Sequence, residues 1–203
     1  MRIVGGTFKG QQIIVPQTGL RPTLDRVREA VTSSIMAYFA SDLRSCRILD
    51  AFAGSGALGL EMLSRGAYSS VFIDDDKRAC VCIQKNIKRL SEDKNTLKTI
   101  VLQGDALRLV DLGLDSVDLD YRPFSLVFLD PPYKKDPKLS EALLTKLANK
   151  QLLAQGALIV HEREKARPGV SEAIARESGF DILRERSYAH TLVTYFTYCG
   201  ALN

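Results

Sequence analysis

The chain has 203 residues, of which 45% are hydrophobic and 26% charged, and its formal net charge is +4. This size and composition predict one globular domain with a hydrophobic core and room for a small extension. The positive excess permits a polyanionic partner but is too small to identify a nucleic-acid-binding protein. No apolar run approaches the roughly 20 residues of a membrane helix, and the first residues do not resemble a secretory signal. We therefore expect a cytoplasmic protein with no membrane partner.

The first segment, RIVGGTFKGQQIIVP, contains two short β-branched runs separated by a gap with glycines at both ends. This pattern predicts a β-hairpin with a loop of several residues. Apolar residues then recur at helical spacing from Leu24 to Phe39, with Thr23 as a candidate N-cap. We therefore predict an N-terminal β-hairpin extension over residues 1–22 and the main domain over residues 23–203.

From Cys46 onward the pattern alternates between strands and helices. The expected strands are 46–52, 69–76, 97–106, 124–130, 156–162, 180–188 and 191–199. The expected helices are 56–66, 77–90, 137–150 and 170–179. Strands separated by helices predict an α/β fold with a mostly parallel sheet, and the last two strands must be antiparallel because almost nothing connects them. A seven-stranded sheet of this kind, with a terminal antiparallel hairpin, resembles the Rossmann-like fold of class I methyltransferases.

A glycine-rich turn joins the first expected strand, 46–52, to the first expected helix, 56–66. Gly54, Gly56 and Gly59 satisfy the pattern G-x-G-x-x-G between an expected strand and an expected helix, and Asp74 follows twenty residues after Gly54. Glycines allow the backbone to turn sharply and approach a ligand, and an acid at this distance accepts hydrogen bonds from ribose hydroxyls. The pattern therefore predicts a site for a cofactor that contains a ribose.

The acid just before the loop indicates which cofactor this is. Asp50 ends the preceding strand, where its charge would repel the diphosphate of NAD or FAD and attract the ammonium and sulfonium groups of S-adenosylmethionine. We therefore predict S-adenosylmethionine. Asp105 and Ala106 follow the third strand and are candidates for contact with the adenine, and Asp75 is a weaker candidate that could instead cap the next helix.

The stretch SLVFLDPPYKK predicts a strand that ends in a rigid polar loop. Asp130 offers a carboxylate, Pro131 a carbonyl and Tyr133 a flat ring, while Pro132 stiffens the backbone. Two acceptors and a ring suit a planar group that carries an NH2. By accepting both amine protons they would free the nitrogen lone pair to attack the sulfonium methyl group. The predicted catalytic residues are Asp130, Pro131, Pro132 and Tyr133.

Several motifs together resemble the RsmD family, the bacterial 16S ribosomal RNA guanine-N2 methyltransferases. They are GGTFKGQQIIVP, RPTLDRVREAV, LDAFAGSGALGLEMLSRGA and VFLDPPY, and the resemblance extends over nearly the whole chain. It implies that Asp50 to Gly56, with Phe52 among them, line the methionine part of the cofactor, and that Asp74 holds the ribose. The family more often has Glu at position 74, so the ribose contact is expected to differ slightly in geometry.

The resemblance also implies an RNA substrate, expected to be 16S rRNA within a small-subunit particle, and we expect the protein to act as a monomer. Basic residues near the motifs could contact phosphates and position the RNA, while the pocket reads a base that has left its stack. The candidate RNA-contacting residues are Arg2, Lys9, Arg21, Thr23, Arg26, Lys134 and Lys135. The sequence does not identify which nucleotide is methylated.

Three alternatives remain at this point. DNA adenine-N6 methyltransferases share the motif D-P-P-Y but usually carry a recognition domain that this chain has no room for. Protein glutamine methylation usually goes with Asn at the first motif position, and a non-catalytic ribosome-assembly factor could retain the same fold. No metal site is expected, because the four cysteines and the two histidines, His161 and His190, do not follow zinc-ligand spacing.

Overall fold

The computed structural model describes residues 1–16, 25–91, 97–112, 114, 117–118, 120–132, 136, 138–166, 169–170 and 172–200. The side chains of residues 25, 26 and 172–174 are outside this description. The strands are β1 (Arg47–Asp50), β2 (Ser69–Asp74), β3 (Thr99–Gln103), β4 (Phe124–Leu129), β5 (Leu153–Glu164), β6 (Phe180–Tyr188) and β7 (Thr191–Tyr198). The helices are α1 (Asp25–Tyr38), α2 (Ala57–Ser64), α3 (Lys77–Ser91), α4 (Ala106–Leu112), α5 (Lys138–Asn149) and α6 (Glu172–Glu177).

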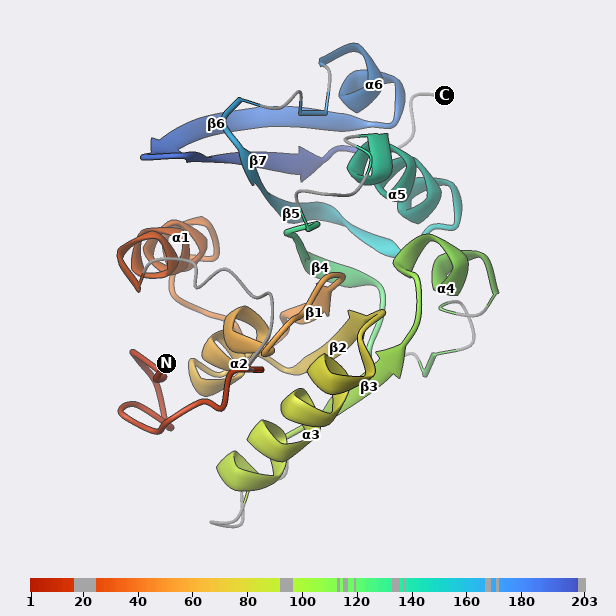
Figure 1. The fold of residues 1–203 in the computed structure, drawn as a ribbon. Coiled ribbons are helices and arrows are strands. Elements are labelled where there is room, and N and C mark those ends of the chain that lie inside the picture. The colour runs from red at the N-terminus through yellow and green to blue at the C-terminus, as the bar shows by residue number, and fades with distance from the viewer. Residues whose placement is uncertain are drawn as a thin grey trace. The chain divides into compact units, whose positions relative to one another are not determined.

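The seven strands form one mixed sheet in the order β3-β2-β1-β4-β5-β7-β6 (Figure 1). β1 pairs in parallel with β2, β2 with β3 and β4 with β5, whereas β7 runs antiparallel to both β5 and β6. The predicted α/β fold class, with a parallel core and a terminal antiparallel hairpin, is confirmed. The chain divides into two compact units, Met1–Gly104 and Asp105–Asn203.

In the first unit, strands β1 and β2 are buried along nearly their whole length. Ile48, Leu49, Val71, Phe72 and Ile73 are all fully buried. Such near-continuous apolar runs are typical of parallel strands that helices cover on both faces. α2 and α3 lie against these strands (Figure 1), and both β1 and β2 end in an aspartate where they leave the sheet.

Residues 1–16 double back on themselves and pack on α2. A single antiparallel bridge joins Arg2 to Gln12, so the two arms form a short hairpin without regular strands. The buried carboxylate of Glu61 on α2 accepts hydrogen bonds from the backbone N–H groups of Val4 at 2.8 Å and Gly5 at 2.9 Å. The predicted domain boundary between residues 22 and 23 lies outside the described residues, and it stays a prediction.

Gly6 in this segment is required by the close approach to α2. Gly6 has φ +78°, and a Cβ there would lie 1.8 Å from the carbonyl oxygen of Ser64. The Ser64 hydroxyl donates to the Gly5 carbonyl at 2.6 Å and accepts from the Phe8 N–H at 2.9 Å. Any side chain at Gly6 would therefore push the segment off the helix.

The second unit contains two features that the sequence analysis did not predict. α4, Ala106–Leu112, was not expected, because it has only seven residues and its first residue was assigned to a strand. β5 begins at Leu153 rather than at residue 156, since Leu153 already pairs with Phe124 of β4 ahead of an irregularity in the register. The other expected strands and helices of this unit are present within a few residues of their predicted ends.

Within the described residues, no helix is long and apolar enough to cross a membrane. The same residues contain no group of three or more His, Cys, Asp or Glu side chains that could hold a metal ion. Cys46, Cys80 and Cys82 are buried and Cys199 is exposed, and none of the four is in a disulfide.

Candidate active site

The glycine loop of the first unit folds as a tight connection between β1 and α2. The Ala53 N–H donates to the carbonyl of Ile73 on the neighbouring strand at 2.9 Å, and the Gly56 N–H donates to the Ala53 carbonyl at 2.7 Å. Gly54 and Gly56 have φ values of 55° and 74°, in the left-handed region that favours glycine. The loop therefore needs glycine at both positions that the sequence singled out.

The third glycine of the pattern has a different role. A Cβ on Gly59 would lie 2.4 Å from the ring of Phe72 on β2. Because both groups are buried, a side chain at Gly59 would push α2 away from the sheet. Gly59 therefore sets the helix-to-strand distance, and through it the position of the loop.

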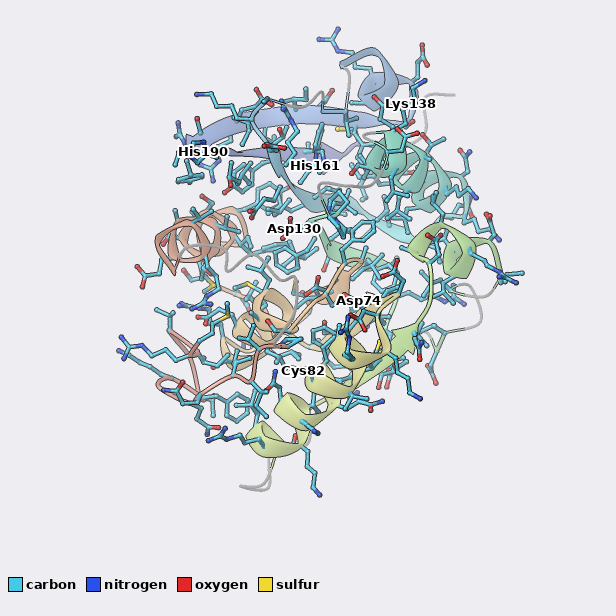
Figure 2. All side chains as sticks on the ribbon, viewed as in Figure 1. Asp74, Cys82, Asp130, Lys138, His161 and His190 are labelled. Carbon is cyan, nitrogen blue, oxygen red and sulfur yellow. The ribbon has the colours of Figure 1, made fainter. Side chains whose placement is uncertain are left out.

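Asp74 lies at the carboxyl end of β2 and holds this loop from the other side (Figure 2). Its two carboxylate oxygens accept hydrogen bonds from the backbone N–H groups of Gly54 at 2.8 Å and Asp76 at 2.9 Å. Burial raises the pKa of Asp74, an effect that these two N–H groups oppose and the charges of Asp75 and Asp76 reinforce. Each oxygen keeps a lone pair for a further donor, as a pair of ribose hydroxyls requires.

Asp50 ends β1 and is buried, with 4% of its surface exposed. The Gly59 N–H approaches its carboxylate at 3.4 Å. Burial raises the pKa of Asp50 to about 7, and the charge of Asp74 adds to the rise while the Gly59 N–H opposes it. A buried carboxylate with so little compensation is stabilised by a cation, so the residues present fit the ammonium end of S-adenosylmethionine better than a diphosphate.

The remaining predicted cofactor residues are less enclosed. Phe52 is half-buried in the turn after β1, and Asp75 is exposed. Asp105 is exposed and accepts a hydrogen bond from the Arg108 N–H at 3.1 Å, so it caps the start of α4. Ala106 is buried as the first residue of that helix. The adenine contact assigned to Asp105 and Ala106 stays a prediction.

In the second unit, the motif follows the buried strand β4. Phe124 to Leu129 are apolar apart from Ser125, and Leu129 pairs with His161 of β5. Asp130 comes directly after this strand and is half-buried, as is Pro131, whereas Pro132 is exposed. Tyr133 lies outside the described residues. The chain thus changes from fully buried to partly accessible at the residue that carries the predicted carboxylate.

The structure describes only part of the predicted RNA-contacting set. Arg2 and Lys9 are both exposed on the N-terminal hairpin. Arg26 lies in α1, but its side chain is not described. Four further candidates lie outside the described residues: Arg21, Thr23, Lys134 and Lys135.

One residue at the loop was not predicted from the sequence. The side-chain amide of Asn86 on α3 donates to the carbonyl of Ser55 in the glycine loop at 3.0 Å. Asn86 is buried on a helix face whose neighbours are apolar, Cys82, Ile83 and Leu90 among them. A polar residue in the apolar stripe of an amphipathic helix is the signal that could have identified it.

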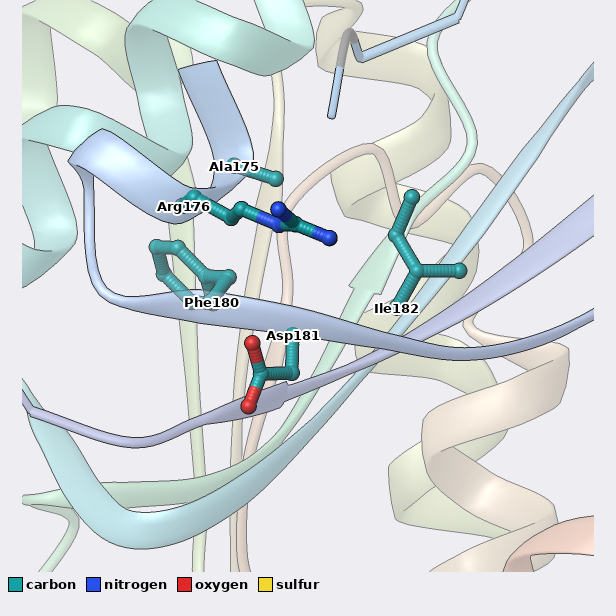
Figure 3. Close-up of a pocket in the computed structure, with 5 residues that line it drawn as sticks. All are labelled: Ala175, Arg176, Phe180, Asp181 and Ile182. Atoms are coloured by element: carbon teal, nitrogen blue, oxygen red, sulfur yellow. The ribbon is translucent and has the colours of Figure 1, made fainter. Parts of the chain in front are cut away.

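A pocket of about 310 Å³ lies elsewhere, between α6 and β6 (Figure 3). Its lining residues are Ala175, Arg176, Phe180, Asp181 and Ile182. None of them was a predicted site residue. The Asp181 carboxylate already accepts a hydrogen bond from the Cys199 thiol at 3.2 Å.

The whole chain resembles proteins of one family. Residues 1–197 match the family model described as Conserved hypothetical protein 95. Ribosomal RNA small subunit methyltransferase D of Escherichia coli strain K12 is 37% identical over 81% of this chain and 75% of its own length. The protein of the same name from Haemophilus influenzae is 34% identical over 83% and 81%.

Solved structures agree with the fold. The YhhF protein of Escherichia coli superposes with a TM-score of 0.74 and 27% identity, covering 98% of both chains. Magnesium protoporphyrin IX methyltransferase from Synechocystis, solved with bound S-adenosylmethionine, has a TM-score of 0.62 at 18% identity over 89% of this chain and 86% of its own, which supports the fold alone. The chain belongs to the Conserved hypothetical protein 95 family, and its resemblance to the RsmD methyltransferases is confirmed.

Proposed function

We propose that this protein transfers a methyl group from S-adenosylmethionine to the exocyclic N2 amine of a guanine in small-subunit (16S) ribosomal RNA, in the cytoplasm. The observation that carries the proposal is the glycine loop held between two aspartates, Asp50 and Asp74, in a chain whose relatives are named ribosomal RNA small subunit methyltransferase D. The coarser activity, methylation of ribosomal RNA, rests on those relatives. The guanine N2 position rests on the motif chemistry and on the family resemblance.

The methyl donor is S-adenosylmethionine, which supplies an electrophilic methyl group on a sulfonium when bound. The chain's own residues bind and orient it. Asp50 pairs with the ammonium, and Asp74 accepts the ribose hydroxyls with the lone pairs that Gly54 and Asp76 leave free. Gly54 and Gly56 let the backbone come close to the methionine part.

Asp130 and the carbonyl of Pro131 hold the target amine. Both accept N–H bonds of the NH2 group, which favours a pyramidal nitrogen and makes its lone pair available. The nitrogen would form a bond to the methyl carbon as the sulfur–carbon bond breaks, with the sulfur keeping the bonding pair as a neutral thioether and the surplus proton passing from the nitrogen to water. No side chain has to remove that proton beforehand, so positioning and preorganised acceptors supply most of the rate.

The substrate surface includes the N-terminal hairpin. Arg2 and Lys9 are exposed there, and the segment that carries them is fixed to α2 by Glu61 and Ser64. A fixed segment with exposed cations can meet an RNA backbone without a large ordering cost. The lysines that follow the motif, Lys134 and Lys135, are proposed to contact the RNA as well.

The proposal is tested with RNA and with small-subunit particles taken from cells that lack the protein. Purified protein and labelled S-adenosylmethionine are added, and the methylated nucleosides are identified by mass spectrometry. N2-methylguanosine in small-subunit rRNA is the expected product. N6-methyladenosine would assign a different amine. A protein that binds small-subunit particles but neither binds S-adenosylmethionine nor methylates RNA would be an assembly factor rather than an enzyme.

A further inference from the structure

Asn86 connects two parts of the first unit that are far apart in the sequence. Its amide nitrogen donates to the carbonyl of Ile14 at 2.9 Å and to the carbonyl of Ser55 at 3.0 Å. Its amide oxygen accepts from the Ile14 N–H at 2.8 Å. One side chain on α3 therefore binds the end of the N-terminal hairpin on one side and the glycine loop on the other.

The contact between Asn86 and the glycine loop is buried. Asn86 is 1% exposed and its hydrogen bond to Ser55 is buried, so removing the amide would leave the Ser55 carbonyl without this donor in a buried place. The Ile14 carbonyl would keep the Cys82 thiol as a donor. Ser55 lies between Gly54 and Gly56, which both have left-handed conformations. Asp74 on strand β2 holds Gly54, and Asn86 on helix α3 holds Ser55, so two elements fix the loop.

We infer that Asn86 is a positioning residue for cofactor binding, which sets the glycine loop through the Ser55 carbonyl and ties that loop to the N-terminal hairpin. It does not touch the cofactor itself. The inference rests on the proposed function only in taking S-adenosylmethionine as the ligand of the loop.

A neighbour on the same helix provides a matched control. The Cys82 thiol donates to the same Ile14 carbonyl at 3.0 Å and is also buried, and its sulfur lies 3.8 Å from the amide nitrogen of Asn86. Unlike Asn86, Cys82 makes no hydrogen bond to Ser55 among the described residues. Cys82→Ala therefore loosens the hairpin end and leaves the loop contact in place. Asn86→Ala removes both contacts, and Asn86→Asp keeps an acceptor for the Ile14 N–H while losing both donated bonds.

The test measures cofactor affinity and the loop separately. S-adenosylmethionine binding is measured by calorimetry on the full chain, and amide hydrogen exchange at Ser55 and Gly56 is measured without ligand. Asn86→Ala and Asn86→Asp should each weaken binding on the order of tenfold, as expected for losing a buried donor, and should speed exchange in the loop. Cys82→Ala should change neither.

Two results would overturn the inference. One is an unchanged dissociation constant in a folded Asn86 variant, and the other is an equal loss in Cys82→Ala, which would show that the hairpin end and not the Ser55 contact matters. Should Asn86→Ala not fold, Asn86→Ser, which places no charge against the Ile14 and Ser55 carbonyls, carries the same comparison. Absence of binding in the unmodified protein would instead contradict the proposed function, so the two failures are distinguishable.

Discussion

The backbone N–H of Gly54 donates to the carboxylate of Asp74 at 2.8 Å, across twenty residues of sequence. The same carboxylate accepts the Asp76 N–H at 2.9 Å. Asp74 therefore shapes the glycine loop before any ligand is bound. An acid at this position is expected to bind the ribose, and here it also fixes the peptide that the ribose approaches.

The first prediction concerns this double role. Asp74→Ala should weaken S-adenosylmethionine binding by roughly 1–3 kcal/mol, because the ribose hydroxyls lose an acceptor and the Gly54 N–H is left unpaired. Asp74→Asn keeps one acceptor oxygen and should lose less. Calorimetric titration measures both, and a dissociation constant for Asp74→Ala equal to that of the unmodified protein would show that the ribose lies elsewhere.

The second prediction follows from the pKa of Asp50, which burial raises to about 7. The carboxyl is mostly protonated below that pH and must ionise to pair with an ammonium. Affinity for S-adenosylmethionine should therefore fall by about tenfold for each pH unit below about 7, with close to one proton released per binding event near pH 6. Titrations in buffers of different ionisation enthalpy count that proton.

A matched variant separates Asp50 from other titrating groups. Asp50→Asn should bind the cofactor weakly at every pH and lose the steep dependence. It should also melt at a higher temperature than the unmodified protein at pH 8 without ligand. The reason is that an acid whose folded pKa is raised costs stability as pH rises from its unfolded value of about 4 through 7. A pH dependence that persists in Asp50→Asn would assign the proton to another residue.

Most of the fold could be read from the sequence because each unit obeys strong local rules. The strands from Arg47 to Asp50 and from Ser69 to Asp74 are short apolar runs that end in an acid, and the helix from Lys77 to Ser91 has a regular apolar stripe. α4 was missed because it has only seven residues and buries only Ala106 and Val110, so its periodicity is weak.

Site residues could be predicted only where their role depends on the sequence immediately around them. Gly54 and Gly56 were identified by spacing, and Asp50 and Asp74 by the ends of apolar strands. Asn86 was not, because its partners Ile14 and Ser55 are 72 and 31 residues away in sequence. Contacts of that kind depend on tertiary packing, which no local pattern encodes.

The third prediction concerns the amine-binding motif. Asp130→Ala should retain S-adenosylmethionine binding, since Asp130 is proposed to serve the amine and not the cofactor. Its methyl-transfer rate should fall by about 10²-fold or more, in line with losing a preorganised polar group. Asp130→Asn keeps an acceptor oxygen and should be intermediate. Single-turnover assays with saturating cofactor check this, and near-normal rates in Asp130→Ala would remove the residue from the mechanism.

The fourth prediction concerns His161, which is 2% exposed and whose Nδ1 has no hydrogen-bond partner among the described residues. Burial lowers its pKa to about 4, with a smaller contribution from the charge of Arg163. The unfolded chain takes up a proton near pH 6.5 and the folded chain only near 4. The histidine should therefore cost about 1.4 kcal/mol of stability per pH unit of acidification within that window.

A comparison of the two histidines tests this. His161→Leu should unfold in urea with less sensitivity to acid between pH 6.5 and 4 than the unmodified protein. His190→Leu, which removes an exposed histidine, is the control variant. Parallel curves for all three proteins would mean that His161 does not contribute to acid unfolding.

The fifth prediction places the RNA. Arg2→Glu with Lys9→Glu should leave folding and S-adenosylmethionine affinity intact, because both side chains are exposed and the hairpin contacts of Arg2 and Lys9 are made by their backbone groups. Binding to rRNA or to small-subunit particles should weaken, and the logarithm of the affinity should depend less steeply on salt concentration. Each phosphate contact that is lost reduces the slope by about 0.7–0.9.

Net charge alone would also weaken RNA binding, so the control must carry the same change in charge. Lys85 and Lys88 on α3 are exposed, lie in the same unit and form no ion pair among the described residues. Lys85→Glu with Lys88→Glu therefore matches the hairpin variant in formal charge, and should lower affinity slightly through long-range repulsion while keeping the slope. Salt titrations of RNA binding by the unmodified protein and the two double variants distinguish the two surfaces. A loss of slope in the α3 variant alone would move the RNA surface to that helix, and an unchanged slope in both would leave the hairpin as packing against Glu61 and Ser64.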